Sequence, residues 1–94
     1  MSESEPVSVV VVTAAGCHYC DHAQQVLDTL GETVPLAVTT VDLSSDEGLA
    51  LMVTHRAGFP PLVIVDGEFF GFGRISLKKL ERRLTQRAAS VGEG

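Results

Sequence analysis

The chain has 94 residues, 45% of them hydrophobic, and its formal net charge is −5 at pH 7. This length predicts a single domain spanning residues 1–94 with a core of modest size. The negative charge argues against a nucleic-acid partner, and no apolar run approaches the roughly 20 residues that cross a membrane. Met1–Pro6 lacks the basic-then-apolar pattern of a signal peptide. We therefore expect a cytoplasmic monomer with no membrane partner, in which residues 1–6 and 88–94 are flexible.

The first half of the chain alternates strand-like and helix-like segments. Val7–Val12 is a β-branched run, typical of a strand buried on both faces. A helix ending near Gly31 follows, because apolar residues recur at helical spacing at Ala23, Val26, Leu27 and Leu30. Leu36–Val41 predicts a second strand. Ser44 or Ser45 is expected to cap a short helix that carries Leu49, Met52 and Val53, with Met52 in the core.

The second half contains a hairpin and a last helix. Asp66-Gly67 is a strong turn signal between two strand-like runs, Leu62–Val65 and Glu68–Phe72. Ser76 is expected to cap a final helix whose inward residues are Leu77, Leu80 and Leu84. The resulting order is β-α-β-α-β-β-α, which predicts an α/β fold. A parallel pair joined through the first helix, extended by the antiparallel hairpin, gives a four-stranded mixed sheet with helices on both faces.

The two cysteines of the chain stand two residues apart, in Cys17-His18-Tyr19-Cys20. This motif follows the first predicted strand and begins the first helix. Backbone N–H groups and the helix dipole favour negative charge at that position, so they favour a Cys17 thiolate. We predict that Cys17 is a redox nucleophile and that Cys20, one turn deeper, resolves the mixed disulfide. The alternatives are structural thiols or half of a metal site, and His22 lies off the face that Cys20 shares.

The residues between the cysteines have two interpretations each. A protonated His18 would stabilise the neighbouring thiolate, or His18 is an exposed spacer. Tyr19 either lines a groove beside the cysteines or covers the helix end.

Basic residues are concentrated near the C-terminus. Five of the seven lie on the last predicted helix: Lys78, Lys79, Arg82, Arg83 and Arg87. They form either a solvated helix face or a docking site for an acidic partner.

The element order and two motifs resemble the thioredoxin fold, and most of all its small glutaredoxin-like members. The motifs are Cys17-His18-Tyr19-Cys20 and Arg56-Ala57-Gly58-Phe59-Pro60-Pro61-Leu62, followed by the Asp66-Gly67 hairpin. The resemblance extends over about Val7 to Arg87. It implies a thioredoxin-like three-layer α/β/α architecture. It also implies that one proline of the second motif is cis and faces the dithiol.

The resemblance implies a substrate-binding or thiol-binding role for the residues around that proline. The family pattern favours Pro60 as the cis residue, whereas counting back from the hairpin glycine favours Pro61. With Pro60 cis, Phe59 would pair through its N–H and C=O with the backbone of a bound peptide or glutathione. Gly73 and Arg74 belong to the corresponding glycine loop, and Arg74 could hold a ligand carboxylate.

The chain departs at several positions from the families that it resembles. Gly16 replaces the tryptophan that thioredoxins carry before the first cysteine, and Val9–Val12 contains no buried acid. His18 replaces the usual proline, whereas Tyr19 is glutaredoxin-like. The segment Gly71–Ser76 keeps glycines and a capping hydroxyl but lacks the acid that holds the γ-glutamyl end of glutathione.

The function implied is that of a glutaredoxin-like thiol–disulfide oxidoreductase acting on protein or low-molecular-weight disulfides. It would require no bound cofactor or metal. Its electrons would come from glutathione, another low-molecular-weight thiol or a flavin reductase. The alternative is a glutathione-dependent iron–sulfur cluster module bridging two subunits, which the absence of proline after Cys17 permits. A non-catalytic protein contact is a third possibility, opposed by the retention of both motifs.

Overall fold

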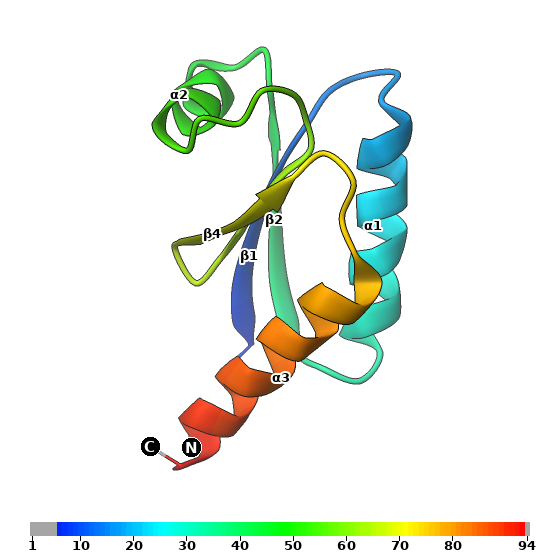
Figure 1. Ribbon diagram of the computed structural model, residues 1–94, viewed down its shortest axis with the longest axis vertical. Coiled ribbons are helices and arrows are strands. Elements are labelled where there is room, and N and C mark those ends of the chain that lie inside the picture. Colours follow the sequence, from blue (N-terminus) through cyan, green and yellow to red (C-terminus); the bar gives the residue numbers. More distant parts are fainter. Residues whose placement is uncertain (1–5, 94) are drawn as a thin grey trace.

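The computed structural model describes residues 6–93, with side chains described for residues 6–86. It contains all seven expected elements in the expected order (Figure 1). Their bounds are β1 Val7–Thr13, α1 His18–Gly31, β2 Leu36–Asp42, α2 Asp46–Thr54, β3 Leu62–Val65, β4 Glu68–Phe72 and α3 Leu77–Glu93. Helix α3 thus continues through residues 88–93, which the sequence predicts to be flexible. The same prediction for residues 1–5 and 94 lies outside the described residues.

The four strands form one mixed sheet in the order β2-β1-β3-β4. β1 pairs in parallel with β2 and antiparallel with β3, and β3 pairs antiparallel with β4. The central position of β1 explains its continuous valine run, since Val9, Val11 and Val12 are fully buried. Asp66 and Gly67 both have positive φ values, 51° and 80°, as a two-residue hairpin turn with matching twist requires.

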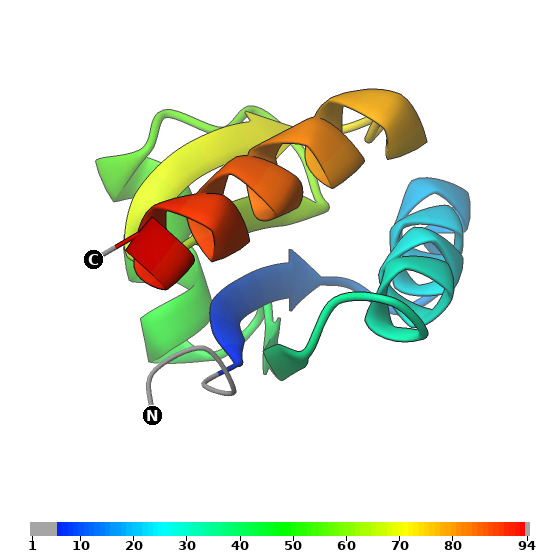
Figure 2. The ribbon, with the colours of Figure 1, turned by 90° about the horizontal axis from the view of Figure 1, so that it is seen from below.

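Helices cover both faces of the sheet, which confirms the three-layer thioredoxin-like architecture (Figures 1 and 2). One face packs against α1 and α3, and its core contains Val9 and Val63 from the sheet with Leu27 and Leu80 from the helices. The other face packs against α2, where Met52 meets a smaller cluster. The sheet residues of that cluster include Val12 and Val41, near the C-terminal ends of β1 and β2.

The N-terminus of α2 is fixed by a hydrogen-bond network around Asp42. Ser45 is the cap, and its hydroxyl oxygen accepts from the Gly48 N–H at 3.0 Å. Ser44 instead donates its N–H and its hydroxyl to the Asp42 carboxylate, at 2.7 and 2.6 Å. These bonds, the side-chain one foremost, hold the pKa of Asp42 below its usual value. The network anchors α2 directly to the end of β2.

Helix α3 begins after Ser76, as the sequence predicts, but its first residue does not point inward. Ser76 is its cap, since its hydroxyl oxygen accepts from the Lys79 N–H at 3.2 Å. Leu80 is fully buried, but Leu77 is 41% exposed, so the prediction that Leu77 points inward is wrong. Ile75, just before the cap, is buried in the same cluster as Leu80. This pair forms the hydrophobic staple that fixes how the chain enters α3.

Candidate active site

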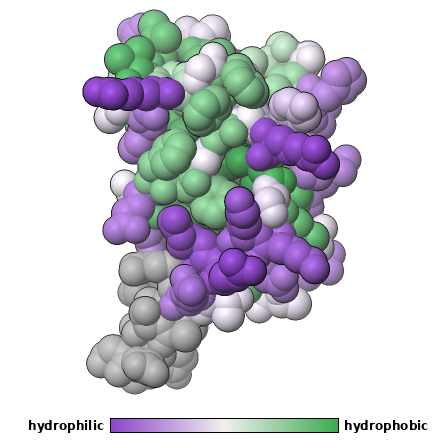
Figure 3. All heavy atoms as spheres, in the orientation of Figure 1, coloured by the Kyte–Doolittle hydropathy of each residue, from purple (hydrophilic) through white to green (hydrophobic). Residues whose placement is uncertain are grey.

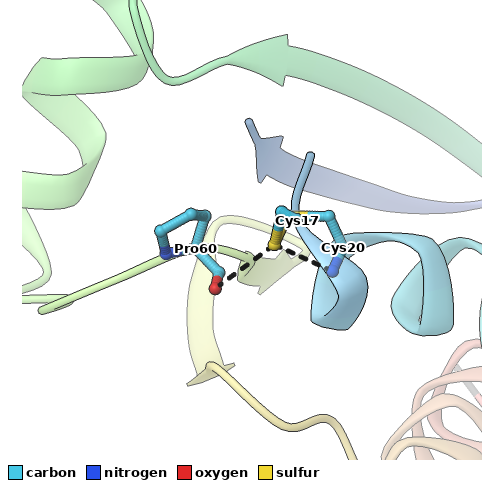
Figure 4. Close-up of a disulfide and its surroundings, with 3 residues drawn as sticks. All are labelled: Cys17, Cys20 and Pro60. Atoms are coloured by element: carbon cyan, nitrogen blue, oxygen red, sulfur yellow. Dashed lines mark hydrogen bonds between the residues drawn. A yellow bond between two sulfur atoms is a disulfide. The ribbon is translucent and has the colours of Figure 1, made fainter. Parts of the chain in front are cut away.

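Cys17 lies at the N-terminus of α1, where the sequence places it. Gly16 supplies the positive φ of the turn after β1, 72°, and Cys17 is the N-cap residue in extended conformation. The Cys20 backbone N–H donates to Cys17 Sγ at 3.1 Å (Figure 4). An N–H directed at sulfur favours the thiolate that reduction would produce. The sequence prediction of a sulfur held by the helix terminus is therefore supported by geometry.

The two cysteines form a disulfide with their Cα atoms 5.2 Å apart. They differ strongly in accessibility, because Cys20 is only 4% exposed and Cys17 is half-buried. The outer sulfur is therefore the one that a large disulfide substrate can reach.

The cis peptide bond joins Pro60 to Pro61, so the prediction of a cis Phe59-Pro60 bond is wrong and the alternative, Pro61, is correct. The reason is the position of Pro61 directly before β3. The Pro61 carbonyl accepts from the Gly73 N–H at 2.8 Å, just beyond the last paired residues of β3 and β4. The sheet therefore fixes the position of Pro61, which counting back from the hairpin predicts.

Pro60 consequently occupies the position that the sequence assigns to Phe59. The Pro60 carbonyl oxygen lies 3.8 Å from Cys17 Sγ (Figure 4). A proline nitrogen carries no hydrogen, so Pro60 can accept a hydrogen bond beside the dithiol but cannot donate one. The expected pairing through both the N–H and the C=O of Phe59 is corrected to an acceptor at Pro60.

Phe59 covers the loop rather than presenting its backbone to the dithiol. Its ring is 52% exposed and meets the ring of Phe72 edge-to-face, with centroids 5.3 Å apart. Gly73, with φ 79°, leaves room for that ring, because a Cβ there would lie 2.7 Å from it. Phe59 and Gly73, both predicted as binding residues, thus pack together as one wall next to Pro60.

A hollow of about 360 Å³ opens between that wall and α2. Phe59 and Pro60 line it, together with Leu49 and Val53, which are 57% and 69% exposed. The sequence predicts a helix that carries Leu49 and Val53, but it indicates no function for either residue. Their helical spacing with Met52 was the available signal, yet spacing alone does not tell an exposed apolar surface from a core face.

His18 and Tyr19 are exposed in the first turn of α1, with Tyr19 at 47%. Both are accessible to a substrate at Cys17, and their modulating roles stay predictions. Arg74 is exposed in the loop after β4 and lines a hollow that reaches His22 of α1. Arg74 therefore lies beside the dithiol helix.

Two further properties concern only the described part of the chain. No group of three or more His, Cys, Asp or Glu side chains within it could hold a metal ion. No helix within it is both long and apolar enough to span a membrane.

The solved structures that resemble this chain share its fold. An uncharacterised thioredoxin-like protein from Clostridium perfringens matches with a TM-score of 0.70 and 15% identity, over 86% of this chain and 70% of that one. A thioredoxin mutant from Halobacterium salinarum matches with a TM-score of 0.65 and 24% identity, over 90% and 78%. The thioredoxin pre-protein of Schistosoma mansoni gives 0.63 and 21%, over 86% and 78%. No curated protein matches the sequence.

The family is shown by a sequence comparison. The glutaredoxin family model matches residues 9–70, a span that contains the dithiol, the proline loop and most of the sheet. The match covers more than half of the chain and contains both cysteines, Pro60 and Phe59, whereas Gly73 lies just beyond it. The chain therefore belongs to the glutaredoxin family.

Proposed function

We propose that the protein is a thiol–disulfide oxidoreductase in which Cys17 attacks a substrate disulfide and Cys20 resolves the product. The observation that carries this proposal is the asymmetry of the pair at the start of α1. Cys17 Sγ is accessible and receives the Cys20 N–H, whereas the Cys20 side chain is buried. Membership of the glutaredoxin family supports the same reaction class.

The proposed reaction transfers two electrons to the substrate. The Cys17 thiolate attacks one sulfur of the substrate disulfide, forming a mixed disulfide and releasing the other sulfur as a thiolate, which takes up a proton. Cys20 then loses its proton and attacks Cys17 Sγ. This second exchange breaks the mixed disulfide, releases the second substrate thiol and closes the Cys17–Cys20 disulfide that the structure contains.

The surroundings of Cys17 suit a peptide-like disulfide. The Pro60 carbonyl can accept a backbone N–H of the substrate, since it lies 3.8 Å from the attacking sulfur. The hollow next to Phe59 can receive an apolar side chain that neighbours the substrate cysteine. We therefore include disulfide-containing proteins, in the cytoplasm, among the proposed substrates.

The electron donor is proposed from the family and from the open site. Glutathione or another low-molecular-weight thiol can reach the half-buried Cys17 sulfur and reduce the Cys17–Cys20 disulfide in two exchanges, while a flavin reductase is the alternative donor. Arg74 is exposed near α1 and is the candidate partner for a carboxylate of a small thiol.

Reduction of insulin disulfides tests the proposal. The protein is assayed with glutathione, glutathione reductase and NADPH, and in parallel with thioredoxin reductase and NADPH. We expect turnover with at least one donor, and we expect Cys17→Ser to lower the rate to that of the assay without protein. Full activity in Cys17→Ser, or inactivity with both donors and with dithiothreitol, would contradict the proposal. Visible absorbance after anaerobic purification with glutathione would favour the cluster-binding alternative.

A further inference from the structure

Four basic side chains line a groove of about 390 Å³ between β4 and α3. Arg74 comes from the loop before α3, and Lys79, Arg82 and Arg83 come from α3 itself. Figure 3 shows this hydrophilic band over α3, directly below the apolar surface of β4. None of the residues that line the groove is acidic. Among residues 6–86, no carboxylate forms an ion pair with any of the four cations.

This local positive charge stands against the net charge of the chain, which is −5. At long range the net negative charge of the protein repels an acidic peptide. The four cations can attract the peptide only when it lies close to the groove. At about 0.1 M salt the Debye length is about 10 Å, which confines the effect of the four cations to their surroundings. The groove can therefore select an acidic ligand that the remaining surface does not attract.

The floor of the groove suits an extended chain. β4 is an edge strand of the sheet, so its outer backbone groups pair with no other strand in residues 6–93. Phe70 and Phe72 of β4 supply apolar surface, and the Arg83 guanidinium carbon lies 5.4 Å from the centre of the Phe70 ring. A peptide segment with carboxylates would meet cations along α3 and a backbone edge along β4.

Two residues of the groove lie next to elements of the candidate active site. Arg74 lines both the groove and the hollow that reaches His22, two residues after Cys20 on α1. Phe72 lines the groove and also contacts Phe59 of the proline loop. A segment seated in the groove can therefore belong to the same molecule as a disulfide bound at Cys17.

From this geometry we infer that the β4–α3 groove docks an acidic, extended segment of the protein substrate that flanks its target disulfide. The inference rests on the proposed function and narrows its substrate class. Of the two interpretations of the basic helix, it favours a docking site for an acidic partner over a solvated face. Only some of the basic residues take part, because only part of the helix faces the groove. Lys79 lines the groove, whereas its neighbour Lys78 lines two other hollows.

The adjacent lysines provide a matched pair of variants. Lys79→Glu and Lys78→Glu change the net charge equally, on the same helix, and both side chains are exposed. Arg82→Glu is a second change inside the groove. Each reduced protein is mixed with a fluorescent peptide disulfide, and the second-order rate constant of a single turnover is measured, so no electron donor is needed. One peptide carries three glutamates on each side of its cysteine, and the other carries glutamines at the same positions.

At low salt we expect the acidic peptide to react about 10-fold faster than the glutamine peptide, an advantage that 0.5 M NaCl removes. Lys79→Glu and Arg82→Glu should each lower the acidic-peptide constant about 5-fold and leave the glutamine-peptide constant unchanged. Lys78→Glu should keep more than half of the parent's rate constant for the acidic peptide. Equal losses in Lys78→Glu and Lys79→Glu, or equal constants for the two peptides, would overturn the inference. Failure of the proposed function is a separate result, since it would leave the glutamine peptide unreduced as well.

Discussion

Replacing Pro60 with valine would add a hydrogen-bond donor beside the dithiol. The Pro60 carbonyl lies 3.8 Å from Cys17 Sγ, and its nitrogen carries no hydrogen. A substrate backbone can therefore donate to this residue but finds no donor for its own carbonyl. Valine keeps an apolar side chain of similar size and restores the N–H.

The expected gain is that of one hydrogen bond to a peptide carbonyl. Such a bond contributes about 0.5–1.5 kcal/mol net, which corresponds to roughly a 2- to 13-fold lower KM for a peptide disulfide. We expect kcat to change little, because the added donor contacts the substrate backbone and neither sulfur. The assay is steady-state reduction of a fluorescent peptide disulfide by the parent protein and by Pro60→Val.

A modified substrate separates the two backbone bonds. Methylating the amide nitrogen of the substrate cysteine removes the donor to the Pro60 carbonyl, which should raise KM about 2- to 13-fold in the parent protein. The improvement brought by Pro60→Val should persist with this methylated substrate, because it uses the substrate carbonyl. An unchanged KM in Pro60→Val, or a parent protein indifferent to methylation, would refute the proposed one-sided contact.

Two further predictions concern Gly73, after β4, and Asp42, which anchors α2. Gly73→Ala should destabilise the protein by about 1–2 kcal/mol in urea denaturation, because its φ of 79° disfavours a side chain and its Cβ would displace the ring of Phe59. Gly71→Ala is the control, since its Cβ would meet nothing within 4 Å, and equal effects of the two changes would contradict the explanation. Asp42→Asn should lower the free energy of unfolding at pH 7, because the bonds from Ser44 hold the pKa of Asp42 below its usual value and so favour the folded, ionised form. That difference from the parent should be constant above about pH 5 and shrink as pH falls below about 4 through the lowered pKa; a difference independent of pH would contradict this assignment.

Local sequence signals predict most of the fold, because a short run of residues is enough to specify each of these strands, turns and helix starts. The valine run of β1 needs burial on both faces and receives it at the centre of the sheet. Asp66-Gly67 specifies a hairpin through backbone geometry alone, and both residues adopt the positive φ that such a turn requires. The dithiol is likewise predictable, because the end of a strand and the start of a helix place Cys17 at the N-cap.

The remaining features depend on contacts that local sequence does not contain. Two adjacent prolines offer equivalent local signals, and only the pairing of Pro61 with Gly73 across the loop distinguishes them. Leu77 fits the helical spacing of the buried Leu80 and Leu84. Ile75, from the preceding loop, nevertheless occupies the core position at that end of the helix. The staple signal, an apolar residue before the Ser76 cap and another four helical positions later, could have identified Ile75.

At the site, too, local sequence predicts some features, and others depend on tertiary contacts. A count of basic residues identifies α3 as a charged helix. It does not show that the turn after β4 brings Arg74 into the same groove as Lys79 and Arg82. The exposure of Leu49 and Val53 depends on how α2 packs against the sheet. Asp42, at the end of β2, helps to fix that position through its hydrogen bonds with Ser44.

Trapping of a mixed disulfide tests the central claim, that Cys17 attacks and Cys20 resolves, most directly. Reduced Cys20→Ser and reduced Cys17→Ser are each mixed with the same peptide disulfide, and intact mass with peptide mapping locates any adduct. We predict a stable peptide adduct on Cys17 in Cys20→Ser, because the resolving sulfur is absent, and little or no adduct in Cys17→Ser, because the Cys20 side chain is only 4% exposed. An adduct that forms on Cys20 as fast as on Cys17 would contradict the account.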